Sequence, residues 1–251
     1  MARRMPDLNN EVMMTADELL EEFEGRWDTG DPPDVFAAVS RCPTPELAET
    51  AAEIIQIDIE RRWRSNSSQL VRTLTHYLEI LTDVFDASQL AELMAWEYRI
   101  RQQWGDCVSR ASFLQSYQHY GIDVLTVIDS AANDIAWPEI TVSVNGQNAV
   151  RTLFDREITA GRQRSSAERP WSVQTSPLWR HLVLTERHDA SLSRQQLRLY
   201  RSAPQKVTLE NISRNRALSV EGYSPIDAGA SLECRIPVAV HLGQQRFLRV
   251  H

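Results

Sequence analysis

The sequence predicts an α + β protein of two domains, in which an all-α domain of helical hairpins precedes an all-β sandwich. Apolar residues recur at helical spacing through the first half, and short alternating runs separated by turn residues fill the second. Between them stands Trp137-Pro138, where proline ends any helix and disfavours helix at the residue before it. The 251 residues suffice for two domains. We expect a leader at 1–14, a helical domain at 15–137 and a sandwich at 138–251.

The first helix begins with a capping box. Thr15 and Glu18 stand three residues apart, so the hydroxyl and the carboxylate can each accept a backbone N–H that the helix leaves unpaired. An apolar stripe follows and ends at Trp27, before Gly30 and the prolines at 32 and 33. The aromatic stripes of these helices are expected to form the core, because helical spacing alone explains them.

Five further helices complete the predicted helical domain. Their starts are the polar capping residues or turns at Thr44-Pro45, Ser67-Ser68, Asp86, Ser109 and Gly121. Helix ends near Trp27, Trp63 and Arg101 are followed by turns whose first residues lie 35 and 40 positions apart. That period is typical of stacked helical hairpins.

These repeated phrases resemble the helical segments beside the catalytic domain in Ser/Thr protein kinases of planctomycete-type bacteria. The resemblance implies a kinase as a partner. Three unrelated helix ends would produce the same pattern, so both interpretations stay open.

Beyond residue 138 the alternation predicts strands. Ile140–Val144 leads into Asn145-Gly146, a strong hairpin-turn signal. Further short strands are predicted at Arg156–Arg162, His181–Leu184, Gln195–Tyr200, Lys206–Glu210, Leu218–Val220, Ser231–Cys234, Val238–His241 and Arg246–Val250. The longest stretch without a predicted element, Gln163–Trp179, is expected to be a partner-facing loop or a lid over the sandwich edge.

Charge and composition exclude several classes of protein. Residues 139–251 carry 16 Lys and Arg against 10 Asp and Glu, a net charge of +6, whereas residues 1–138 carry 11 against 24, a net of −13. The acidic half argues against nucleic-acid binding, and the basic half suits a phosphorylated or acidic partner. No run of eighteen apolar residues predicts a membrane span, and the N-terminus lacks a signal-peptide core. Three widely spaced cysteines favour reduced thiols, so we expect a cytoplasmic protein.

A family resemblance rests on the order of motifs in the C-terminal half. A strand ends in Gly161-Arg162, the stretch Ser191-Leu192-Ser193-Arg194 precedes another strand, and Leu209–Ser213 follows later. Ile226–Gly229 and the closing run 242–250 complete the order. This order resembles the forkhead-associated (FHA) domain and covers residues 139–251. The resemblance implies an FHA-like β-sandwich that binds phosphothreonine peptides with its loops.

The resemblance also implies which residues bind the phosphopeptide. Arg162 and Ser193 match the arginine and serine of the family pattern, and Arg194 is the basic residue after that serine. Arg214 adds charge to a neighbouring loop whose Asn215 would read the peptide backbone. A hydroxyl beside guanidinium groups is what a phosphate needs, because arginine presents a planar fork of donors and stays charged.

The sequence departs from the family pattern in two places. Gln196 replaces the family's structural histidine, and Asn215-Arg216-Ala217 replaces its Thr-Asn-Gly loop. Two functions therefore stay open: a phosphothreonine-binding adaptor in Ser/Thr kinase signalling, and a phosphate-independent scaffold with a degenerate FHA domain.

We expect no enzymatic activity, no catalytic residues and no cofactor. The sequence contains no nucleophile elbow, P-loop or kinase loop set. His181 and His188 have no cysteine or carboxylate at ligand spacing, so no metal site is predicted.

Overall fold

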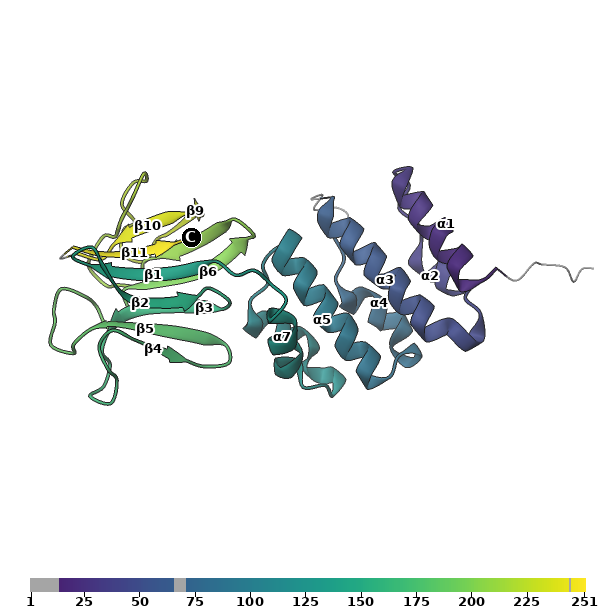
Figure 1. The fold of residues 1–251 in the computed structure, drawn as a ribbon, viewed down its shortest axis with the longest axis horizontal. Helices are drawn as coiled ribbons and strands as arrows, with labels where there is room; N and C mark the ends of the chain where they lie inside the picture. Colours follow the sequence, from purple (N-terminus) through teal and green to yellow (C-terminus); the bar gives the residue numbers. More distant parts are fainter. Residues whose placement is uncertain (1–13, 66–70, 244) are drawn as a thin grey trace, which may run out of the picture. The chain divides into compact units, whose positions relative to one another are not determined.

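The computed structural model describes residues 14–65, 71–243 and 245–251. Helices come first along the chain and strands follow, drawn from purple to teal and from teal to yellow in Figure 1. The predicted fold class, a helical region followed by a sandwich of two β-sheets, is confirmed. The packing divides the chain into two compact units, with the division after Glu97.

The helices of the described chain largely follow the predicted order. They are α1 (Ala16–Asp28), α2 (Val35–Val39), α3 (Leu47–Arg64), α4 (Leu74–Leu81), α5 (Ala87–Trp104), α6 (Arg110–Tyr117) and α7 (Val124–Ala132). The predicted capping box is confirmed: the Thr15 N–H donates to Glu18 Oε2 at 2.9 Å, and the Glu18 N–H donates to Thr15 Oγ1 at 3.3 Å. The helix expected to start at Ser67-Ser68 begins at Leu74, and those two serines lie outside the described residues, as does most of the predicted leader.

Helix α3 contributes a charged side chain to the interior of the N-terminal unit. Asp58 is fully buried and accepts a hydrogen bond of 2.6 Å from Arg62 Nε, one helical turn further on. The hydroxyl of the buried Tyr77 on α4 also donates to Asp58. Two donors on one carboxylate offset part of the cost of removing the ion pair from water.

The C-terminal unit contains two packed sheets. The first has the order β2 (Gln147–Leu153), β1 (Glu139–Val144), β11 (Arg246–Val250), β10 (Val238–His241) and β8 (Ser219–Val220). The second has the order β4 (Ser172–Thr175), β5 (Trp179–Thr185), β3 (Glu157–Arg162), β6 (Leu197–Ala203), β7 (Lys206–Glu210) and β9 (Ser231–Arg235). Alternate residues of both sheets bury one apolar cluster, which includes Ile140, Val142, Leu182, Leu199, Leu209, Val240 and Leu248.

Two details of the strands correct or confirm the sequence prediction. The prediction that Gln163–Trp179 holds no strand is wrong, because β4 pairs antiparallel with β5 inside it. Asn145 and Gly146 adopt φ of 51° and 81°, the left-handed values of a tight hairpin turn between β1 and β2.

The change from helices to strands lies between Ala132 and Glu139, but packing groups the chain from Tyr98 onward with the strands. The domain boundary at residue 138 stays a prediction.

Strand direction decides which loops meet. β6 runs antiparallel to both β3 and β7. The end of β3, the start of β6 and the end of β7 therefore lie at one end of the sheet, and the start of β3, the end of β6 and the start of β7 lie at the other.

Candidate functional site

The predicted binding residues line one cavity at the end of the sheet where β3 ends and β6 begins. The cavity, here called the loop cavity, has a volume of about 700 Å³. It is lined by Arg162, Arg164, Ser193, Arg194, Gln195, Ile212, Arg214, Asn215 and Arg216. All five predicted residues are among them, drawn from three separate segments of the chain. Their assignment to phosphopeptide binding stays a prediction.

Gly161 allows the segment before β6 to lie against β3. A Cβ built at this position would stand 2.2 Å from the carbonyl oxygen of Arg194 and 2.9 Å from that of Ser193. Both neighbours are backbone atoms, which cannot rotate away as a side chain can. The Arg162 N–H donates to the Ser193 carbonyl at 3.0 Å. This hydrogen bond and the close approach at Gly161 fix the position of Ser193 beside Arg162.

Gln196 holds the same segment from inside. Its side chain is buried, and its Oε1 accepts the N–H of Ser193 at 3.1 Å. Its own backbone N–H donates to the carbonyl of Ala160 at 2.8 Å. The glutamine that departs from the family pattern therefore still supplies an acceptor that orients the Ser193 backbone.

A charged pair supports the segment from the other sheet. Arg246 of β11 is buried and donates to Asp189 Oδ2 at 2.8 Å and to Ser191 Oγ at 2.9 Å. The Ser191 N–H also donates to Asp189 Oδ1 at 2.8 Å. Burial alone would raise the pKa of Asp189, but the hydrogen bonds from Ser191 and the charge of Arg246 outweigh it, and the pKa is lowered. The carboxylate thus stays ionised and keeps the segment in place.

Asn211 organises the loop that follows β7. It is fully buried, and its Nδ2 donates to the carbonyl of Arg216 at 2.6 Å and to that of Ile226 at 2.8 Å. Its Oδ1 accepts the N–H of Ser213 at 3.2 Å. One side chain therefore closes the loop that carries Arg214 and Asn215, both of them exposed.

Arg216 joins the two loops. Its Nη1 donates to the carbonyl of Ser191, on the segment before β6. The two sides of the loop cavity are therefore linked by a side chain as well as through the sheet.

The arginines of the loop cavity differ in how much of their charge is already engaged. Arg162 Nη1 donates to the carbonyl of Arg187 at 2.7 Å. Arg164 lies 3.8 Å from a carboxylate oxygen of Glu168 and 5.9 Å from the ring centroid of Trp179. Within the described residues, the side chains of Arg194 and Arg214 have no hydrogen bond or ion pair. They remain free to bind an anion.

The charged side chains that line the loop cavity are all positive. The lining contains five arginines and no Asp or Glu. Such a cavity attracts anions and repels cations. The described part of the chain shows no group of three or more His, Cys, Asp or Glu side chains that could hold a metal ion.

Sequence reasoning missed several residues that build this site. Asn211, Asp189 and Arg246 are buried or half-buried supports whose contacts cross between loops and sheets. Their signal in the sequence is weak, because polar residues at strand ends are ordinary.

Among the described residues, no helix is long and apolar enough to cross a bilayer.

Solved structures that match the chain include an FHA domain. No family model and no curated protein sequence matches the chain. The FHA domain of the CT664 protein from Chlamydia trachomatis is 17% identical, with a TM-score of 0.33, and the match covers 46% of this chain and 96% of that one. The functional proposal therefore rests on the geometry of the loop cavity.

Proposed function

We propose that the C-terminal unit is a non-enzymatic binding module that captures phosphothreonine peptides in the loop cavity. The observation that carries the proposal is the convergence of a hydroxyl and five arginines on a cavity without carboxylates. A phosphate dianion needs several charge-assisted donors, and guanidinium groups supply them in pairs.

Each predicted residue has a role that its position supports. Ser193, oriented by Gln196, would donate its hydroxyl to a phosphate oxygen. Arg194 and Arg214 would bind the phosphate from opposite loops. Arg162 would bind it from the end of β3 while holding the carbonyl of Arg187. Asn215, exposed beside Arg214, would hydrogen-bond the peptide backbone.

The charge of the loop cavity exceeds what one phosphate neutralises. A phosphothreonine carries a charge of about −1.5 to −2 at neutral pH. Glu168 lies within ion-pair distance of Arg164. The other four arginines of the lining have no ion pair among the described residues. We therefore propose that the preferred peptides carry acidic residues beside the phosphothreonine.

The helical unit would bring a second partner to this ligand. The resemblance of its repeated phrases to kinase-associated helices makes a Ser/Thr protein kinase the proposed partner. The whole chain would then act as an adaptor in kinase signalling.

Fluorescence anisotropy of labelled peptides with the full chain tests the proposal. The panel contains phosphothreonine, phosphoserine and unphosphorylated peptide libraries, each with acidic and with neutral flanks. We expect saturable binding of the phosphothreonine libraries, tighter with acidic flanks. Arg194→Ala should weaken this binding about tenfold, the effect of removing one charge-assisted hydrogen-bond donor.

The matched control is Arg235→Ala, an exposed arginine on β9 outside the loop cavity. Both variants should unfold at the same denaturant concentration as the native chain. Equal affinity for phosphorylated and unphosphorylated peptides would favour the phosphate-independent scaffold instead.

A further inference from the structure

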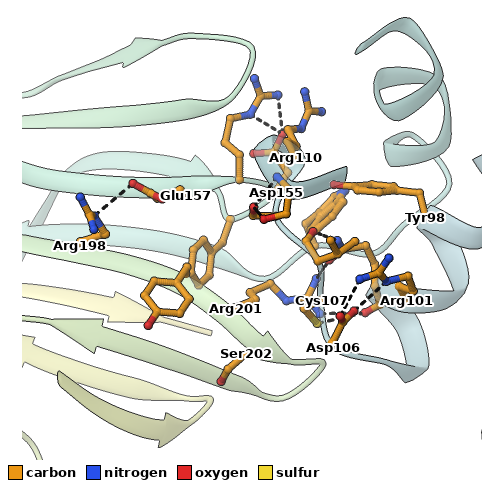
Figure 2. A pocket seen from close by; sticks show the side chains of 18 of the residues that line it. Tyr98, Arg101, Asp106, Cys107, Arg110, Asp155, Glu157, Arg198, Arg201 and Ser202 are labelled. Carbon is orange, nitrogen blue, oxygen red and sulfur yellow. Dashed lines mark hydrogen bonds and ion pairs between the residues drawn. The ribbon is translucent and has the colours of Figure 1, made fainter. Parts of the chain in front are cut away.

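A second cavity lies toward the other end of the same strands. It has a volume of about 630 Å³ and is lined by the end of α5, the loop between α5 and α6, the start of β3 and the strand β6. Every lining residue belongs to the C-terminal unit. Figure 2 shows Arg201 extending from β6 toward the loop that carries Asp106 and Cys107.

Each acidic side chain that lines this cavity already pairs with an arginine. Asp106 receives two hydrogen bonds from Arg101, at 3.0 and 2.7 Å. Arg198 lies 3.3 Å from Glu157 and 3.1 Å from Glu210. Asp155, the remaining acidic residue of the lining, pairs with Arg156 at 2.7 Å and with Arg180 at 2.6 Å.

Arg201 differs from the paired arginines of this cavity, because no ion pair joins it to a carboxylate of the described residues. Among the described residues, its guanidinium donates to neutral oxygens alone: Gln102 Oε1 at 3.3 Å, the Gln102 carbonyl at 3.2 Å and the Pro204 carbonyl at 3.2 Å. Its Nε is buried and has no hydrogen-bond partner in the part of the chain that the structure describes. Within the described residues Arg201 has no carboxylate partner. A largely buried cation without a counter-ion is costly, and burial lowers the pKa of Arg201 accordingly.

A second guanidinium of the lining also has an unused donor. Arg110, at the first turn of α6, is only 2% exposed. It pairs with Asp129 at 2.7 Å and donates to the Pro177 carbonyl at 2.9 Å, but its Nε has no hydrogen-bond partner. The N-terminus of the same helix adds a positive potential.

Aromatic side chains form another part of the lining. The Arg201 guanidinium carbon lies 5.2 Å from the ring centroid of Trp137, which holds the side chain against one wall. Tyr200 is 37% exposed, and Phe154 also contributes to the lining. A cavity of this size, in which aromatic side chains lie beside charged and polar ones, has the dimensions of a small-molecule site.

We propose that this Arg201 cavity binds a small organic anion, whose phosphate or carboxylate group pairs with Arg201 and whose body lies against the aromatic walls. The anion would supply the counter-charge that the fold leaves out. The cavity and its ligand are independent of the loop cavity.

Isothermal titration calorimetry of the full chain tests the proposal with three probes: inorganic pyrophosphate, citrate and ADP. We expect saturable binding of at least one probe. Preference for pyrophosphate over citrate would assign a phosphate ligand, and the reverse a carboxylate. Tighter binding of ADP than of pyrophosphate would show that the aromatic walls take part.

Three variants locate the binding. Arg201→Gln keeps hydrogen-bonding capacity without the charge and should weaken binding at least tenfold. Arg235→Gln is the matched exposed control and should leave it unchanged. Because the loop cavity also attracts anions, Arg194→Ala should weaken any binding of the probes there and leave the binding that depends on Arg201 in place, which separates the two sites.

Thermal unfolding without ligand gives a second readout. Arg201→Gln should melt no lower than the native chain, since it removes a largely buried charge that has no carboxylate partner among the described residues. The proposal is overturned if none of the probes binds saturably, or if Arg201→Gln binds them as the native chain does. Should that variant not fold, Arg201→Lys, which keeps the charge and loses the planar fork, must bind more weakly.

Discussion

The two cavities of the C-terminal unit use arginine in opposite ways, although the same three strands carry both. In the loop cavity Arg194 and Arg214 are exposed, so their charges are hydrated until a ligand arrives. In the Arg201 cavity the guanidinium has already lost much of its water and gained only neutral acceptors. The exposed arrangement suits a broad class of acidic peptides, whereas the buried one suits a single small ligand of defined shape.

A substitution at Gly161 should have the largest effect on the loop cavity. Gly161→Ala places a methyl group 2.2 Å from a backbone carbonyl oxygen, so the segment before β6 must move. We expect a loss of about 3 kcal/mol in unfolding free energy, as for an overpacked core, and loss of phosphopeptide binding. Urea denaturation and peptide anisotropy measure the two effects.

Gly25→Ala serves as the control for Gly161→Ala. Gly25 lies within helix α1 and has open space around its Cα, so alanine there should stabilise the chain by roughly 0.5–1 kcal/mol. Native-like stability of Gly161→Ala would show that the approach of the segment to β3 is not required.

Asn211 and Asn215 form a matched pair on one loop. Asn211→Ala removes one of two donors to each of the carbonyls of Arg216 and Ile226, and it removes the acceptor of the Ser213 N–H. We therefore expect a loss of about 2 kcal/mol and weaker peptide binding. Asn215→Ala removes an exposed side chain and should weaken peptide binding alone. Neither variant should change the affinity of the Arg201 cavity for its anion, which calorimetry checks.

The last expected effect concerns a buried basic group that stays neutral. His181 on β5 is fully buried, with Nδ1 2.8 Å from Thr159 Oγ1 and Nε2 without a hydrogen-bond partner. Burial lowers the pKa of His181 to about 4, with help from the charge of Arg164. Because the folded pKa lies below the unfolded value of about 6.5, this stability is present above pH 6.5 and is lost as the pH falls toward 4.

We expect the unfolding free energy to fall by about 2 kcal/mol between pH 7 and pH 5 through His181. Denaturant titrations at the two pH values measure it. In His181→Gln this part of the pH dependence should vanish; a variant with the native pH dependence would contradict the assignment.

The sequence predicted the sheets better than the site. Strands with β-branched and apolar alternation, such as Val238–His241 and Arg246–Val250, were found at the predicted bounds because one face of each is buried. Strand β4 escaped prediction: it is half-buried, lies at the edge of its sheet and contains only one apolar residue, Val173.

Only those site residues that stand in the order of a known family pattern could be predicted from the sequence. Gly161, Arg162 and Ser193 stand in a recognisable sequence, so their convergence was foreseeable. The Arg201 cavity was not, because it depends on residues of a helix and a loop as far as 99 positions earlier in the chain. The ion pairs matter as well. Arg198 and Arg201 look alike in the sequence, and the structure shows that Arg198 pairs with two carboxylates whereas Arg201 pairs with none among the described residues.

The choice of basic residue has a practical consequence for measuring either ligand. Lys206 is the one lysine among the 27 basic residues, and it lies at the start of β7, where it pairs with Glu233 at 2.6 Å. The loop cavity lies beyond the other end of that strand. Amine-reactive dyes or surface coupling would therefore spare every arginine of the loop cavity, and acetylation, which acts on lysine, has no target among the residues that line it.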